Sequence, residues 1–149
     1  MSPPADPLSR AFEEARAAAA RGEAPIGAVV TRAGEVISAA GNRTLERSDP
    51  TAHAEMLAIR AACAALGSQR LPDCDLYVTL EPCAMCAGAI SFARIRRLYF
   101  AADDPKGGAV EHGPRFFAQP TCHHAPEVYG GLRASEAGDL LRRFFSERR

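Results

Sequence analysis

The sequence predicts an α/β fold, with a mixed sheet covered on both faces by helices. Short apolar runs that are typical of buried strands alternate with longer stretches whose apolar residues recur at helical spacing. Elements that alternate in this way pack as a sheet between layers of helices. The chain of 149 residues is about the size of one domain, and its 47% hydrophobic content suffices for a buried core. We therefore expect residues 1–149 to form a single domain.

Hydrophobic spacing and turn signals place the elements of the N-terminal part. A helix is expected over residues 6–21, because its apolar residues recur at helical spacing and Gly22 follows them. The prolines at its start predict that residues 1–5 are frayed. Two apolar runs, 26–31 and 36–40, flank a short turn signal that contains a glycine, and together they predict a hairpin.

The next helix, expected over residues 52–66, carries two chemically significant side chains. Thr51 is a good N-cap candidate, and Gly67 is a stop signal. His53 and Glu55 then lie in the first turn of this helix. Since residues two apart on a helix point to different faces, the pair can serve one metal ion only if that ion sits over the helix mouth.

A short strand leads into a helix that begins with cysteines. The strand is expected over residues 75–80 and the helix over 83–93, with Pro82 at its first position. Cys83 and Cys86 are one turn apart on one face near the helix N-terminus. There the helix dipole and a metal ion both favour the thiolate over the thiol.

The C-terminal part contains the segment that is hardest to assign. Residues 97–102 predict a further strand, and residues 134–148 predict a final amphipathic helix. The segment 107–131 between them gives no clear pattern. The chain contains no internal repeat, low-complexity tract or linker. In folds of this kind, ligands bind at the carboxyl ends of the strands, so the functional site is expected there.

Charge and cysteine content narrow the classes of function. Eighteen basic and eighteen acidic residues give no net charge, so any contact with RNA must come from local patches. No apolar run reaches the roughly 20 residues needed to span a bilayer, and the N-terminus lacks the pattern of a secretion signal. We therefore expect a cytoplasmic protein that makes no membrane contact. Five cysteines, two of them spaced C-x-x-C, favour reduced thiols and a metal over disulfides.

Two short motifs predict a catalytic zinc site. His-Ala-Glu is followed thirty residues after the histidine by Pro-Cys-Ala-Met-Cys. The motifs supply His53, Cys83 and Cys86, which are the ligand types that zinc prefers, and three ligands rather than four leave one tetrahedral position for water. Glu55 can then move the protons of that water, as hydrolysis on a purine or pyrimidine ring requires. The combination predicts a hydrolytic deaminase.

The other metal-capable cysteines fit less well. Cys63 lies ten residues after His53 on the same expected helix, roughly 15 Å along its axis, which is too far for the same ion. Cys74 begins the strand whose other end reaches the site. Both are expected in the core. The run Cys122-His123-His124 stays open, because metal-capable residues on a loop could fold back to the zinc or line the pocket.

Two further titratable residues are expected to have no part in the chemistry. His112 has no partner pattern in the sequence, so we expect it in a solvated loop. Glu81 could be mistaken for the second carboxylate of an acid/base pair. Its position between a strand end and Pro82 suits a structural turn better.

The motifs resemble the H-x-E and P-C-x-x-C signature of the cytidine-deaminase superfamily. Their flanks narrow the resemblance to the bacterial tRNA-specific adenosine deaminases, closely from residue 24 to 108 and more loosely from 109 to 132. The stretches that carry it are 24–30, 41–43, 49–55, 76–90 and 143–149. The resemblance implies a three-layer α/β/α, cytidine-deaminase-like fold around the mixed central sheet, a bound Zn²⁺ ion and a homodimer.

The resemblance also implies residues that contact the substrate. Asn42 matches an asparagine that hydrogen-bonds the flipped base, and an amide offers both a donor and an acceptor to a purine. Asp104 and Lys106 resemble positions that contact RNA around the target nucleotide. Phe145 belongs to a cationic, aromatic C-terminal helix that resembles the last helix of the family. Each has a structural alternative: a turn asparagine, inert loop charges and a core-capping phenylalanine.

The predicted function is zinc-dependent hydrolytic deamination of adenosine to inosine at the wobble position of an arginine tRNA. The partner would be the anticodon stem-loop, whose target base must leave the stack to reach the site. A free nucleobase or nucleoside deaminase, acting on guanine or cytosine, would use the same zinc chemistry. A non-catalytic RNA-binding subunit that keeps zinc only for stability would have no use for Glu55 as a proton shuttle.

Overall fold

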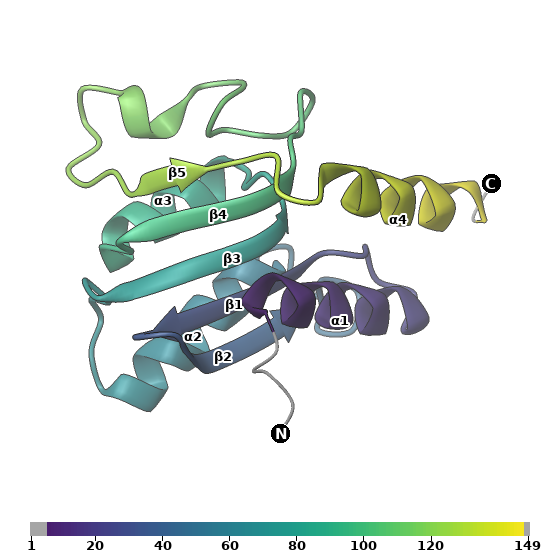
Figure 1. Cartoon of the computed structure of the whole chain (residues 1–149), viewed down its shortest axis with the longest axis horizontal. Coiled ribbons are helices and arrows are strands. Elements are labelled where there is room, and N and C mark those ends of the chain that lie inside the picture. The colour runs from purple at the N-terminus through teal and green to yellow at the C-terminus, as the bar shows by residue number, and fades with distance from the viewer. Residues whose placement is uncertain (1–5, 148–149) are drawn as a thin grey trace.

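The central feature of the computed structural model, which describes residues 6–147, is one mixed five-stranded sheet (Figure 1). The strands are β1 (Gly27–Arg32), β2 (Glu35–Gly41), β3 (Cys74–Leu80), β4 (Arg97–Ala102) and β5 (Glu127–Tyr129), in the order β2-β1-β3-β4-β5. Strand β1 runs antiparallel to β2 and β3, whereas β3, β4 and β5 are parallel. The expectation of a frayed segment at 1–5 lies outside the described residues.

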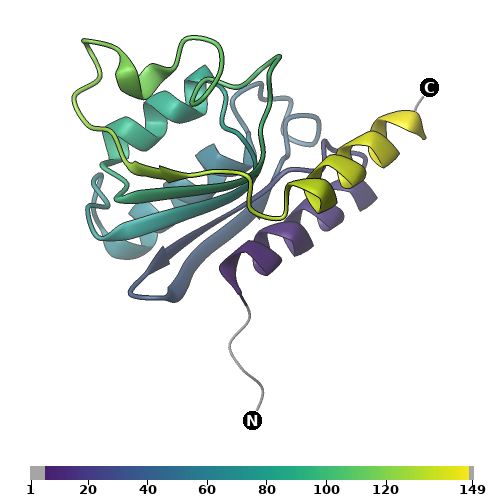
Figure 2. The same ribbon diagram turned by 45° about the horizontal axis from the view of Figure 1, so that its top comes forward.

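Helices cover both faces of this sheet. They are α1 (Pro7–Ala20), α2 (Ala54–Leu66), α3 (Ala84–Ala93) and α4 (Ala134–Ser146), with a 3₁₀ turn, η1, at Phe116–Ala118. Helices α1 and α4 lie side by side on one face, and α2 and α3 lie on the other (Figures 1 and 2). Each face has its own buried apolar cluster. The expected α/β/α fold is confirmed.

A close contact between α1 and the sheet depends on one glycine. A Cβ atom at Gly27, the first residue of β1, would lie only 2.0 Å from the carbonyl oxygen of Ala11 in α1. Any other residue would push the helix off the sheet, because such a contact cannot be relieved without moving backbone. Phe12, one residue further along α1, is fully buried in the cluster on this face. No described helix is long and apolar enough to cross a membrane.

The predicted start of α2 was wrong by two residues, and the predicted cap was wrong as well. The N-cap of α2 is His53, and Thr51 donates from its backbone N and its Oγ1 to Asp49 Oδ1, at 2.8 and 2.7 Å. Thr51 therefore closes a local turn before the helix. The predicted stop at Gly67 is confirmed.

The start of α3 also differs from the expectation. Cys83 is the N-cap, so Pro82 precedes the helix and does not occupy its first position. Both N-caps that begin helices at the site, His53 and Cys83, have extended backbones, and neither makes a side-chain capping hydrogen bond. Their side chains are therefore available to bind something else.

Strand β5 was missed from the sequence. It has three residues, lies at the edge of the sheet beside β4 and is mostly exposed. Such a strand carries neither an apolar run nor an alternating pattern long enough to be recognised. It adds a third parallel strand to the half of the sheet beside the site.

Candidate active site

The N-termini of α2 and α3 meet at the carboxyl end of β3, where the site was expected. His53 Nδ1 lies 3.6 Å from the Sγ atoms of both Cys83 and Cys86. The ligand atoms of the three residues all lie within 4.8 Å of one another. The three residues lie at the N-termini of α2 and α3, as expected from the two-residue spacing of His53 and Glu55.

This cluster fits a zinc ion. Within residues 6–147 it is the single group of three or more histidine, cysteine or acidic residues close enough to hold a metal. One imidazole and two thiols are the donor set of zinc sites that keep one position open. Such a cluster is typical of the zinc site of deaminases.

The two thiols differ in their tendency to ionise. A hydrogen bond from Cys86 lowers the pKa of the Cys83 thiol to about 5, against the opposing effect of burial, and nearby His53 lowers it further. The same hydrogen bond, together with burial, raises the pKa of Cys86. One thiolate is thus already favoured at neutral pH before a metal binds. A cation that replaces the shared proton would let the second thiol ionise as well.

Glu55 lies beside this cluster in the first turn of α2. The residue is 4% exposed, and its Oε1 atom has no hydrogen-bond partner among the described residues. Burial raises the pKa of its carboxyl to about 7. Buried polar atoms almost always have partners, so an unpaired carboxylate oxygen in a pocket points to a ligand or a proton-transfer role. The pocket has a volume of about 160 Å³ and also contains Ile26, His53, Leu80, Glu81, Cys83, Asp104 and Gly107.

Asn42 is buried next to this region, and hydrogen bonds to Glu23 and Thr44 fix its side chain. Its side-chain nitrogen donates to Glu23 Oε1 at 3.4 Å and to Thr44 Oγ1 at 3.2 Å. Its backbone N donates to the carbonyl of Ile26, which lines the pocket. With both amide hydrogens directed at acceptors within the chain, the side-chain carbonyl oxygen is the group that Asn42 can offer to a base.

Glu23 was missed by the sequence reasoning. It is 2% exposed, and besides the Asn42 amide it accepts the backbone N–H groups of Leu45 and Glu46, at 3.1 and 2.8 Å. Its partners lie about twenty residues away in the chain. No local pattern could therefore have identified it.

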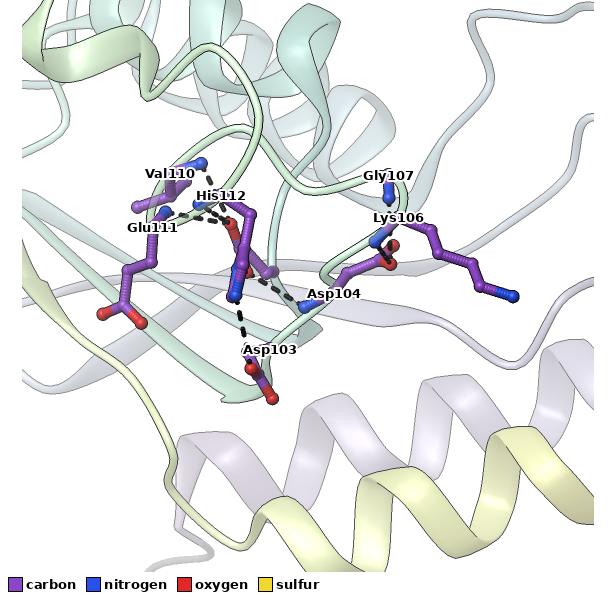
Figure 3. Close-up of polar contacts among 8 residues, drawn as sticks. Asp103, Asp104, Lys106, Gly107, Val110, Glu111 and His112 are labelled. Atoms are coloured by element: carbon purple, nitrogen blue, oxygen red, sulfur yellow. Dashed lines mark hydrogen bonds and ion pairs between the residues drawn. The ribbon is translucent and has the colours of Figure 1, made fainter.

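The two loop residues that were expected to contact RNA, Asp104 and Lys106, have different surroundings in the structure. Asp104 lines the pocket, and its Oδ1 accepts the backbone N–H groups of Lys106 and Gly107, at 3.2 and 3.0 Å. Asp104 thus folds its own loop. The Lys106 side chain is exposed and extends away from these contacts (Figure 3).

Phe145 is 54% exposed and packs edge to face on the buried Phe144, with 5.3 Å between ring centroids. Only Phe144 caps the core, so the structural alternative holds for that residue and not for Phe145. Helix α4 extends beyond the end of the sheet at which strands β3 and β4 terminate (Figure 1). Phe145 does not line the zinc pocket.

Glu81 stabilises a turn, as expected from its position. One of its partners is His112, whose surroundings differ from the prediction. The Glu81 side chain is 0% exposed and accepts a bond from His112 Nδ1 at 2.8 Å. His112 Nε2 also lies 3.6 Å from Asp103 Oδ2. His112 is therefore a partly buried, bonded residue, and the prediction of a solvated loop residue was wrong. Its partner lies 31 positions away in the chain, beyond the reach of any local pattern.

The Cys122-His123-His124 run lies away from the zinc cluster. Cys122 Sγ is 3.6 Å from the hydroxyl of Ser91, and His124 Nε2 is 2.7 Å from the carbonyl oxygen of Ile95. These partners belong to the C-terminal end of α3 and the turn after it, whereas the cysteine ligands lie at the N-terminal end. The run therefore ties the loop 119–126 to α3. Cys74 is buried in the core, and the partly buried Cys63 packs against it, as expected.

Comparisons with known proteins agree with this site. Residues 5–136 match the MafB19-like deaminase family. The tRNA-specific adenosine deaminase of Agrobacterium fabrum is 66% identical over 95% of this chain and 93% of its own length. A structure from a study of A-to-I editing by wobble-position tRNA deaminases is 64% identical and covers 91% of this chain and 98% of its own, with a TM-score of 0.89.

A more distant likeness bears on the alternative substrate. The guanine deaminase of Nitrosomonas europaea is 29% identical and covers 98% of this chain and 86% of its own, with a TM-score of 0.81. The fold is therefore shared with a guanine deaminase, while the two tRNA-acting relatives described above are 66% and 64% identical to this chain. The match over most of both lengths shows that this chain belongs to the tRNA-specific adenosine deaminases, within the MafB19-like deaminase family.

Proposed function

We propose that this chain is a zinc-dependent hydrolase that converts adenosine to inosine at the wobble position of a tRNA anticodon, with an arginine tRNA as its substrate. The observation that carries the chemistry is the unpaired, buried Oε1 of Glu55 beside a histidine and two cysteines. The similarity to tRNA-specific adenosine deaminases over almost the whole chain supports the substrate.

The residues divide the chemistry between metal binding and proton transfer. His53, Cys83 and Cys86 hold the zinc, which supplies an activated water at neutral pH when it is bound. Glu55 takes one proton from the attacking water and delivers it to N1 of adenine. It then takes the second proton of that water, from the oxygen now bonded to C6, and passes it to the amino group, which leaves as ammonia as the carbonyl of inosine forms. Burial raises the pKa of this carboxyl, which makes it a better proton acceptor than an exposed glutamate.

The pocket and its rim hold the base. A volume of about 160 Å³ admits little beyond the reacting base, so the target nucleotide must leave its stack in the anticodon loop. In this proposal the Asn42 carbonyl oxygen accepts a hydrogen bond from the base. Asp104, Lys106 and Phe145 contact the flanking RNA. The similarity to the family also supports a single domain, a homodimer and action in the cytoplasm.

Deamination of a defined RNA tests the proposal. Zinc-loaded protein is incubated with an unmodified arginine tRNA transcript that carries adenosine at the wobble position, and inosine and ammonia are measured. The matched control transcript carries guanosine at that position, and parallel reactions contain free adenosine, guanine or cytosine. Inosine should form only in the first transcript. Ammonia from guanine or cytosine, without inosine in the transcript, would support the free-base alternative, which the likeness to a guanine deaminase favours over other free-base activities.

A further inference from the structure

A second buried carboxylate, that of Glu81, has no part in the proposed reaction. It links the segment that carries the cysteine ligands to the wall of the pocket. Glu81 lies two residues before Cys83, and its side chain is 0% exposed. Its Oε1 accepts from the backbone N of Asp104 at 2.9 Å and from His112 Nδ1 at 2.8 Å. Its Oε2 accepts three consecutive backbone N–H groups, those of residues 110, 111 and 112, at 2.9 to 3.2 Å. Figure 3 labels the residues that donate these bonds, at positions 104 and 110–112.

The backbone around Glu81 reinforces the same connection. Its own N–H donates to the carbonyl of Ala102 at 2.8 Å, and the carbonyl of Pro82 accepts from Ala109 at 2.9 Å. Glu81 is thus fixed to the end of β4 on one side and to the loop 108–112 on the other. Because only Pro82 separates it from Cys83, the loop is held at a fixed position relative to a zinc ligand.

Gly108 shows how tightly the loop closes on this carboxylate. A Cβ atom at Gly108 would lie 2.5 Å from both Cδ and Oε2 of Glu81 and 2.6 Å from the carbonyl oxygen of Asp104. Neither neighbour can yield cheaply, since one is a buried side chain with five hydrogen bonds and the other is backbone. Any side chain at this position would therefore have to displace the Glu81 carboxylate or the backbone of Asp104.

The loop held in this way forms part of the pocket wall. Asp104 and Gly107 line the zinc pocket, and the segment from 103 to 112 also carries the exposed Lys106. We propose that Glu81 is a positioning residue, which fixes the loop 103–112 over the zinc ligands and thereby sets the affinity of the site for its RNA substrate. The inference deepens the proposed function and rests on it.

A purely structural glutamate and a positioning glutamate predict different results. A structural role lowers the stability of the whole domain and leaves the Michaelis parameters of the folded enzyme unchanged. A positioning role loosens the loop 103–112 and weakens RNA binding, while the reacting groups keep their places. The expected signature is a rise in KM with little change in kcat, because the lost contacts act on binding.

Three variants disturb this carboxylate to different degrees, and a fourth is a matched control. Glu81→Gln keeps the shape but turns one acceptor oxygen into an NH₂ group that faces donors. Gly108→Ala pushes on the carboxylate without changing any polar group. His112→Ala removes one of the five hydrogen bonds to Glu81, together with the contact to Asp103, and is expected to leave the fold intact. Gly138→Ala is the control, since its Cβ would meet only the guanidinium end of the exposed Arg142 side chain, at 3.1 Å.

Each variant is assayed for zinc content, for amide hydrogen exchange by segment, and for KM and kcat on an anticodon stem-loop RNA. For Glu81→Gln and Gly108→Ala we expect one zinc per chain and faster exchange in 103–112 but not in 54–66. We also expect KM to rise about tenfold, the effect of one lost charged hydrogen bond, with kcat within about threefold of the original. His112→Ala should give a smaller change in the same direction, and Gly138→Ala none.

Unchanged exchange in 103–112, an unchanged KM, or a fall in kcat at constant KM would each overturn the proposal. Should Glu81→Gln fail to fold, Gly108→Ala and His112→Ala decide the question by the same criteria. The exchange measurement needs no substrate. If the unmodified enzyme does not deaminate RNA, the proposed function fails, while the exchange data still show whether Glu81 holds the loop.

Discussion

Two glutamates at the edge of one pocket have opposite surroundings. Glu55 and Glu81 are about equally buried, with 4% and 2% of the whole residue exposed, and both line the pocket. One oxygen of Glu55 has no partner among the described residues, and burial raises the pKa of that carboxyl to about 7. Burial opposes ionisation of Glu81 too, but bonds from the Asp104 amide, from His112 and from the loop amides outweigh it and lower the pKa.

We interpret this contrast as the difference between a group proposed to react, Glu55, and a group that holds structure, Glu81. An unpaired buried carboxylate costs free energy, so its presence indicates a task in chemistry. A carboxylate with five hydrogen bonds is fully satisfied, and it keeps a loop in place. Replacing each residue should therefore affect different properties of the protein.

The largest effect is expected when the metal, on which the role of Glu55 depends, is removed. Cys86→Ala deletes a fully buried ligand at the start of α3. We expect the variant to lose bound zinc, all deaminase activity and part of its stability, because the ion joins the N-termini of two helices. Elemental analysis of the purified protein measures the zinc. Stoichiometric zinc in the Cys86→Ala protein would remove Cys86 from the ligand set.

Glu55→Ala should abolish turnover without disturbing the structure. A general acid/base contributes typically about 10²- to 10⁴-fold to the rate, so single-turnover deamination should fall by at least that factor. Zinc content should stay at one ion per chain, and the thermal midpoint should not fall, since a costly unpaired carboxylate has been removed. Deamination near the original rate in a zinc-loaded Glu55→Ala protein would contradict the assignment.

Glu81→Ala should show the opposite behaviour in stability. The substitution leaves four backbone N–H groups and one imidazole without their acceptor in a buried place. Breaking such a buried, charged arrangement costs about 3–5 kcal/mol of unfolding free energy. Urea denaturation of Glu81→Ala and Glu55→Ala, each with bound zinc, makes the comparison directly. A loss below about 1 kcal/mol for Glu81→Ala would mean that water replaces the carboxylate.

The smallest effect is expected far from both glutamates, at the end of α4. Deleting residues 146–149 removes Arg148 and Arg149, which lie outside the described residues, and leaves the buried Phe144 in place. tRNA affinity should fall by a few-fold and its dependence on salt should flatten, because each lost phosphate contact lowers the salt slope by about one. Zinc content and fold should be unchanged. Equal affinity and an equal salt slope for both proteins would exclude a role for this end of the helix.

Much of the architecture could be predicted from the sequence, because it depends on local patterns. Helical periodicity and apolar runs gave α1, α4 and four of the five strands to within about two residues. The edge strand β5 was missed, since three mostly exposed residues form it only by pairing with β4. The N-cap predicted at Thr51 and the first helical position predicted at Pro82 were both wrong, since the N-caps are His53 and Cys83.

The sequence by itself determined the chemistry of the metal, because a zinc site needs specific ligand types at the spacing of two helix starts. His53, Cys83 and Cys86 were predicted to converge, and they do. Only the tertiary structure decided how the pocket is held. The bonds of Glu23 to residues 45 and 46 and those of Glu81 to 110–112 join positions 22 to 31 apart. Such hydrogen bonds follow no local period, so they exist only once the sheet and its loops have brought the partners together.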